Sequence, residues 1–228
     1  MYQTINLNYR RVLQLKNNHY ALNSWNAVYY MTAVAICIIG LTASAAAQDG
    51  DFKPYGVESG IVEYTFTGGI EGTENIYFKD FGRREARYVD YVFTSFGNIE
   101  KREVVIIDGP DQYTFDLIEE KGAKQPYIIL AKVRKSENPI DESLPGFEQY
   151  AQADGMKRVG SGEVLGKPTN MWEDRDGAEY HIWNGIPLKV TSYHDGEVAF
   201  VFEAQTIDIG ADIPEEKLAF PEGIEIDE

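Results

Sequence analysis

Residues 163–190 contain two tight chain reversals, and these constrain the fold more than any other stretch. The first reversal ends in Gly177 and the second is the pair Asn184-Gly185. Asn-Gly between runs of alternating apolar residues indicates a β-hairpin, because glycine readily adopts the positive φ that such turns require. Two reversals so close together predict a meander of three short antiparallel strands. The expected strands are residues 169–173, 178–183 and 186–190.

The same alternation recurs elsewhere between residues 48 and 228. Val62, Tyr64 and Phe66 occupy every second position of residues 61–67, and Phe200 and Phe202 do so later in the chain, so each set shares one face of a strand. Further strands are expected at residues 75–79, 83–93, 103–108, 112–118 and 198–207. The sequence therefore predicts one mainly β domain of about nine to eleven antiparallel strands.

Helical patterns are short and lie in the second half. Residues 127–133 are continuously apolar, which fits a buried strand or a helical turn equally well. Residues 147–153 predict a two-turn helix with Ser143 as N-cap and Gly155 as the left-handed cap. The tail predicts a one-turn helix starting at Pro214, followed by a strand at the edge of the sheet.

The first 47 residues have the order of a secretory signal peptide. They contain basic residues but no acidic ones, then an apolar run at 27–41, then small residues ending at Ala47. The apolar run is shorter than the roughly 20 residues that a membrane-spanning helix needs, so we expect cleavage rather than a permanent anchor. Cleavage after Ala45, a start at Met31 and a twin-arginine signal remain alternatives.

The cysteine content and the net charge limit the possible functions of the mature protein, the part expected to remain after signal-peptide cleavage. The only cysteine, Cys37, lies inside the apolar run, so the mature protein should contain no disulfide. The chain has 37 acidic and 21 basic residues, which disfavours nucleic acid and anionic membrane surfaces as partners. We expect a monomer in the periplasm of a Gram-negative bacterium, with secretion as the alternative.

Catalytic patterns are weak. Outside the first 47 residues the histidines are His181 and His194, whose spacing does not match a metal site, and we expect His181 to form a cross-strand hydrogen bond and His194 to lie in a solvated turn. No G-x-S-x-G elbow or phosphate-binding glycine loop occurs. The basic residues at 83–87 could bind an anion, but pairing with carboxylates across the sheet is the stronger expectation. The sequence thus predicts a protein that is not an enzyme, with no cofactor and no metal.

Several motifs, taken in order, resemble the exported lipoprotein-carrier (LolA/LolB-like) superfamily, and more narrowly a periplasmic branch of it without a known function. The motifs are G-x-x-x-G-x-V-x-Y at 56–64, N-I-Y-F-K-D-F-G-R-R-E-A-R at 75–87, the Trp-Glu pair at 172–173, W-N-G-I-P-L-K at 183–189 and I-P-x-x-x-L-x-F-P-E-G at 213–223. The resemblance implies a curved antiparallel half-barrel closed by short plug helices, 147–153 among them, around a space for acyl chains.

Two functions follow from this pattern. In the first, the protein carries an apolar ligand, a lipid or a lipidated protein, against the inward face of the half-barrel. The residues expected to contact it are Val62, Tyr64, Phe66, Phe200 and Phe202, with Trp172 or Trp183 near the mouth. In the second, the same side chains fill the interior, and the protein is a structural or interaction module of the cell envelope. The sequence alone does not separate the two.

Overall fold

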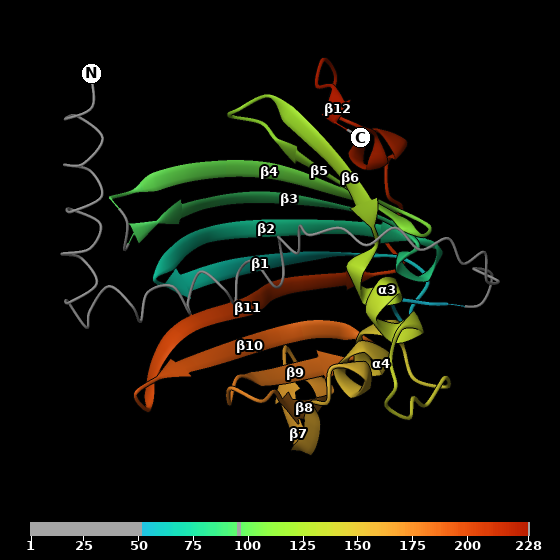
Figure 1. Ribbon diagram of the computed structural model, residues 1–228, viewed down its shortest axis with the longest axis vertical. Coiled ribbons are helices and arrows are strands. Elements are labelled where there is room, and N and C mark those ends of the chain that lie inside the picture. The colour runs from blue at the N-terminus through green and yellow to red at the C-terminus, as the bar shows by residue number, and fades with distance from the viewer. Residues whose placement is uncertain (1–51, 95–96, 228) are drawn as a thin grey trace, which may run out of the picture. The chain divides into compact units, whose positions relative to one another are not determined.

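The computed structural model describes residues 52–94 and 97–227. The predicted signal peptide, residues 1–47, lies outside these described residues. The described chain forms one open, curved sheet of eleven antiparallel strands, to which a short twelfth strand adds in parallel (Figure 1). The predicted fold class, a mainly β half-barrel with two short helices, is confirmed.

The strands fall into two sets that meet at β1. In chain order they are β1 (Gly60–Gly68), β2 (Ile70–Lys79), β3 (Arg84–Phe93), β4 (Ile99–Asp108), β5 (Asp111–Asp116), β6 (Lys121–Pro126), β7 (Lys157–Val164), β8 (Lys167–Glu173), β9 (Glu179–Trp183), β10 (Ile186–His194), β11 (Glu197–Ile209) and β12 (Ile226–Asp227). Their order across the sheet is β12-β6-β5-β4-β3-β2-β1-β11-β10-β9-β8-β7. Most of these strands therefore pair with the strand that comes before or after them in the chain. Among the described strands, only the β1–β11 and β6–β12 pairs join segments that are distant in the sequence.

The β1–β11 pair brings the two predicted aromatic faces together. Phe66 lies opposite Phe202, and Tyr64 lies opposite Ala204 on the same side of the sheet. Residues directly opposite each other in an antiparallel pair have close Cβ atoms and share one face. Alternation within each strand and pairing between the strands thus produce one continuous apolar surface.

The predicted meander is present as β8, β9 and β10. Gly185 in the second turn has a φ of +76°, and a Cβ at this position would meet the carbonyl oxygen of Pro54 at 2.5 Å. The amide of Gly56 donates a hydrogen bond to the carbonyl of Asn184 at 2.8 Å. The turn therefore needs glycine both for its conformation and for the close approach of residues 54–56.

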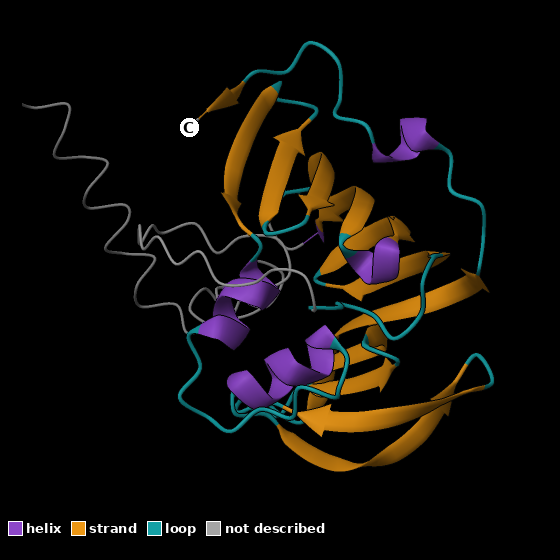
Figure 2. Cartoon of the chain, turned by 90° about the vertical axis from the view of Figure 1, so that its right-hand side faces the viewer, coloured by secondary structure: helices purple, strands orange, loops and turns teal. Residues whose placement is uncertain are grey.

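Two helices lie on the concave side of the sheet, near one end of its strands (Figure 2). The ambiguous apolar run is helical and forms α3 (Ile128–Arg134). The predicted two-turn helix is α4 (Gly146–Ala153), and Gly155 after it has a φ of +77°. The predicted N-cap was wrong: Pro145 occupies that position, while the hydroxyl of Ser143 donates to Asp141 at 2.6 Å. An Asx-type turn competes for the serine side chain.

The C-terminal segment covers the convex side. Its one-turn helix, η3 (Glu215–Leu218), follows Pro214 as predicted. The edge segment was expected within 213–223, but the short edge strand β12 lies after it, at Ile226–Asp227. Ile213 and Leu218 pack with Ala86, Val104 and Ile106 in one buried cluster. The central strands β3 and β4 are consequently covered on both faces.

A second buried cluster lies on the concave side, around Val62, Phe78 and Leu188. It joins β1 and β2 to β10, and Tyr55 of the segment before β1 packs into it. Within the described part of the chain, no helix combines the length and apolar character needed to cross a membrane.

Candidate ligand-binding face

Four of the predicted ligand-contacting residues form an aromatic stack on the concave face. The rings of Tyr64 and Phe202 are parallel within 12° and their centroids lie 4.2 Å apart. Phe66 lies 5.3 Å from Phe202 and 6.3 Å from Phe200 between ring centroids. These distances are in the range of favourable aromatic pairs. The structure therefore brings Tyr64, Phe66, Phe200 and Phe202 together.

The other three predicted residues are not members of the ring stack, but Val62 and Trp183 pack in the same core cluster as Tyr64 and Phe202. Val62 is fully buried in the concave core cluster, and Trp183 packs partly buried against the same cluster. Lys167 Nζ lies 5.0 Å from the centre of the Trp183 ring. Trp172 is 4 % exposed and packs under α4 with Ala151. Neither tryptophan joins the aromatic stack.

The inward apolar surface continues from the stack toward the end of the sheet where β1 connects to β2 and β3 connects to β4. Ile70 of β2 lies opposite Phe93 of β3, which lies opposite Ile99 of β4. Ile70 is 3 % exposed and Ile99 is 50 % exposed, so this inward apolar row becomes open to solvent at β4. Helices α3 and α4 lie near the other end of the strands (Figure 1). Among the described helices, none lies over this part of the face.

Next to the aromatic stack, the concave face carries a buried ionic cluster. It consists of Glu74 on β2 and of Glu85 and Arg87 on β3. Glu74 and Glu85 are only 2 % and 1 % exposed. Arg87 Nε donates to Glu85 Oε1, and its Nη1 lies 3.8 Å from Glu74 Oε1. Two buried carboxylates therefore share a single guanidinium group.

Three buried tyrosines border this cluster. Tyr55 donates a hydrogen bond of 2.5 Å from its hydroxyl to Glu85 Oε2. The hydroxyls of Tyr64 and Tyr127 have no hydrogen-bond partner among the described residues. An unpaired buried hydroxyl destabilises the fold by about 1–3 kcal/mol, so each such group calls for an explanation.

Burial shifts the acidity of these groups. It raises the pKa of Glu74 from 4.5 to about 7; Arg87 opposes the rise and Glu85 adds to it. Burial and the nearby Glu85 raise the pKa of Tyr55 and of Tyr127 as well. Burial lowers the pKa of Arg87, but Glu85 and Tyr55 more than offset this and keep it well above its ordinary value. The tyrosines are neutral and the arginine is charged at neutral pH, whereas Glu74 titrates there.

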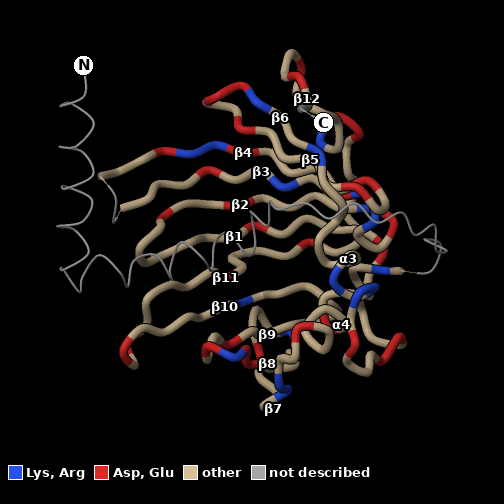
Figure 3. Tube along the Cα trace, in the orientation of Figure 1, with Lys and Arg blue, Asp and Glu red and all other residues tan. Residues whose placement is uncertain are grey.

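Further charged groups extend the polar half of the face across β4 and β5. Tyr91 donates from its hydroxyl to Glu103 at 3.2 Å, and Lys101 Nζ contacts Asp116 at 2.6 Å. Burial raises the pKa of Glu103, and the Tyr91 hydrogen bond opposes that rise. Figure 3 shows charged positions along β3 and β4.

The basic residues at 83–87 are paired with carboxylates. Arg83 bonds Asp80, Arg84 bonds Glu215 at 2.7 Å, and Arg87 contacts the cluster described above. All three arginines pair with carboxylates, but the expected pairing across the sheet is confirmed only for Arg87, whose partner Glu74 lies on the neighbouring strand. What the sequence did not reveal is that this one arginine is buried on the inward face.

The histidines also lie as expected. Thr169 Oγ1 and His181 Nδ1 are 3.2 Å apart on the paired strands β8 and β9, and His194 is exposed at the end of β10, next to the β10–β11 turn. Within the described ranges, no group of three or more His, Asp or Glu side chains is arranged to hold a metal ion.

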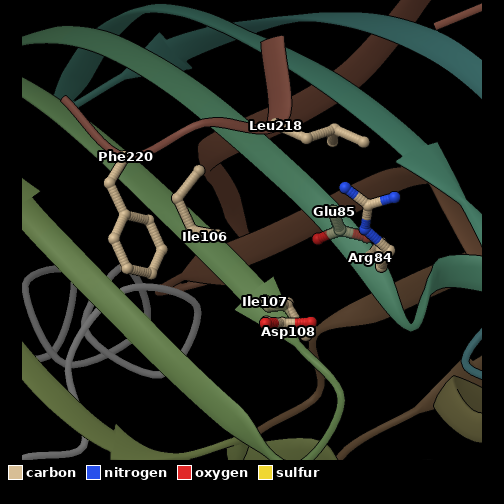
Figure 4. A pocket seen from close by; sticks show the side chains of 7 residues that line it. All are labelled: Arg84, Glu85, Ile106, Ile107, Asp108, Leu218 and Phe220. Carbon is tan, nitrogen blue, oxygen red and sulfur yellow. The ribbon is translucent and has the colours of Figure 1, made fainter. Parts of the chain in front are cut away.

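A small pocket of about 60 Å³ lies between β3, β4 and the C-terminal segment (Figure 4). It has room for a few water molecules but is far below the roughly 300 Å³ of a usual small-molecule site. It is lined by Arg84, Glu85, Ile106, Ile107, Asp108, Leu218 and Phe220. The concave face, rather than this pocket, is the candidate site.

No family model and no curated protein matches the chain. Among solved structures, an uncharacterised conserved protein from Thermus thermophilus is similar over 74 % of this chain and 89 % of its own, with 10 % identity and a TM-score of 0.48. MucB is similar over 72 % of this chain and 58 % of its own, at 20 % identity and a TM-score of 0.42. The Pseudomonas aeruginosa MucA/MucB complex gives 17 % identity, 72 % and 56 % coverage and a TM-score of 0.42.

Proposed function

We propose that this protein is an exported, non-enzymatic carrier that holds an apolar ligand, a lipid or the acyl chains of a lipidated protein, on the concave face of its half-barrel. The observation that carries the proposal is the aromatic stack on the concave face, in which Tyr64 and Phe66 are buried while Phe200 and Phe202 remain partly exposed. The same face extends to Ile99, which is 50 % exposed. Contiguous exposed apolar surface on a folded protein is typical of a binding site.

The expected energetics fit an acyl chain. Each methylene group removed from water contributes about 0.8 kcal/mol, so a chain lying on this surface needs no directed polar contact along its length. The predicted signal peptide supports export and a periplasmic location. The acidic surface supports a protein that remains in solution rather than adhering to anionic membranes.

The proposal is tested by purifying the protein from the cell envelope without detergent and measuring its native mass. A carrier is expected to retain adducts that extract into organic solvent as lipid, under conditions in which a reference lipid carrier stays loaded. A bare mass under the same conditions would favour the second hypothesis, an envelope interaction module with a filled interior.

A matched pair of variants tests where the ligand lies. Phe200→Asp places a charge on the inward row of β11, and Val201→Asp places the same charge on the opposite face of the same strand. We expect saturable binding of a fluorescent fatty acid to weaken at least tenfold in the first variant only. Equal binding by both variants, each folded by circular dichroism, would contradict a ligand on the concave face.

A further inference from the structure

The concave face has two chemically different halves that meet at one residue, Tyr64. Its ring stacks on Phe202 of the aromatic half. Its hydroxyl lies within the electrostatic influence of Glu74, Arg87 and Glu85 and has no hydrogen-bond partner among the described residues. Tyr64 and Glu74 are each 2 % exposed, so a ligand that enters along the partly exposed rings of Phe200 and Phe202 must open this corner to reach the ionic cluster.

The charge of the cluster is unbalanced. Glu74 and Glu85 share Arg87, whose Nε is bonded to Glu85 and whose Nη1 lies 3.8 Å from Glu74, beyond hydrogen-bond distance. With both carboxylates ionised, the buried group carries one excess negative charge. An uncompensated buried charge is costly, so the cluster favours an additional positive charge or a proton beside Glu74.

We propose that this corner binds the ammonium group of an amphiphile whose alkyl chain lies on Phe66, Phe200 and Phe202. This inference rests on the proposed carrier function and narrows its ligand to chains with a cationic amine head. An ammonium group supplies hydrogen-bond donors only. The Glu74 carboxylate and the free lone pairs of the Tyr64 hydroxyl are acceptors for such a group, while an anionic head would be repelled.

Proton and ammonium compete for the same carboxylate. The titratable and charged groups that face Glu74 are Arg87 and Glu85 of β3 and Tyr64 of β1; Tyr55 and Tyr127 lie farther along the same cluster. Since burial raises the pKa of Glu74 to about 7 and the tyrosines stay neutral, Glu74 is the group that changes charge near neutral pH. Affinity for the ammonium ligand is therefore expected to fall by up to about tenfold per pH unit below 7.

The experiment compares the binding of dodecylamine, 1-dodecanol and ethylamine by calorimetric titration of the purified protein at pH 8. Both amines are protonated at this pH, because the pKa of an alkylammonium group resembles that of lysine. We expect dodecylamine to bind at least tenfold more tightly than dodecanol, and ethylamine to bind far more weakly. Glu74→Gln keeps the shape of the side chain but removes its charge. It should bring the ratio of the dodecylamine affinity to the dodecanol affinity close to one.

The matched control is Glu71→Gln, the same change on the same strand at an exposed position of the opposite face. This control is needed because an acidic protein attracts any cation weakly, wherever its carboxylates lie. It should leave the ratio of the dodecylamine and dodecanol affinities unchanged. The pH series on the unaltered protein tests the same point without any substitution.

The outcomes separate the two proposals. Equal affinity for amine and alcohol, or a preference that persists in Glu74→Gln, would overturn the ammonium site and leave the carrier function standing. If ethylamine bound as tightly as dodecylamine, the alkyl chain would contribute nothing to binding. This result would overturn the proposal that the ligand is an amphiphile. Absence of binding by either long-chain compound would overturn both the carrier function and this inference.

Discussion

Arg87 and Glu74 lie on neighbouring strands with 3.8 Å between Nη1 and Oε1, and both side chains are largely removed from water. This contact joins two strands in the middle of the sheet and places charge where the alternation of β2 and β3 would otherwise give apolar side chains. The first prediction follows from its geometry.

Arg87→Met should destabilise the fold by about 3–5 kcal/mol, because it leaves two buried carboxylates without their counter-charge. The measurement is the free energy of unfolding from urea titration. Arg102→Met is the matched control: its 2.7 Å ion pair with Asp90 has side chains that are 64 % and 60 % exposed, so the loss should stay within about 1 kcal/mol. Equal effects of the two changes would show that the buried cluster does not stabilise the sheet.

Stability should fall as pH rises from about 5 to 8. The pKa of Glu74 is about 7 in the folded protein and 4.5 as a free side chain, so the folded state binds the proton more tightly. The resulting stabilisation is complete below pH 4.5 and is lost as pH rises through 7, by up to about 3 kcal/mol. In urea titrations across this pH range, the free energy of unfolding should fall more steeply with pH for the unaltered protein than for Glu74→Gln. Identical slopes would mean that Glu74 is ionised throughout.

Tyr55→Phe should lower the free energy of unfolding by about 1.5–3 kcal/mol, because it removes the 2.5 Å hydrogen bond to the Glu85 carboxylate. Tyr127→Phe makes the same chemical change at a buried hydroxyl that lacks a partner among the described residues, and should be neutral or stabilising. Thermal unfolding of both variants provides the comparison. A larger loss in Tyr127→Phe would reveal a hydrogen bond that these contacts do not include.

The C-terminal segment should stabilise the convex face strongly. Ile213→Ala removes a side chain that is buried at 1 % exposure, and should cost about 2–4 kcal/mol. Ile118→Ala, at a position 54 % exposed, should cost well under about 1 kcal/mol. If urea titration gave similar values for both, the segment would not be a structural part of the domain.

The strands with one buried face were predictable from the sequence, and the strands without one were not. β1 alternates clearly, and the meander has its turns marked by Gly177 and Gly185. β6 (Lys121–Pro126) and β7 (Lys157–Val164) expose most of their side chains, so their sequences show no alternation. Their strand conformation depends on backbone pairing with β5 and β8, which no local pattern records.

The candidate site was predicted in its apolar half only. Tyr64, Phe66, Phe200 and Phe202 could be grouped because each pair alternates on its own strand. Arg87 was interpreted as one of several basic residues that pair with carboxylates across the sheet, and its inward position was not predicted, although Glu85 and Arg87 are in phase with the inward residue Tyr91. That phase was the available indication. Because charged residues are mostly exposed in proteins, the phase alone was not decisive. The packing of Tyr55 and α3 on this face identifies Arg87 as inward and largely removed from water.

The pairing of β1 with β11 also determines when the domain can form during synthesis. Glu63 and Thr206, which are hydrogen-bonded across this pair, are 143 residues apart in the chain. Until β11 has left the ribosome, β1 lacks one of its two neighbours and the inward aromatic residues have no partner across that pair. Such distant pairings form slowly because the chain must first close a long loop. The half-barrel is therefore expected to complete only after nearly the whole chain has been synthesised.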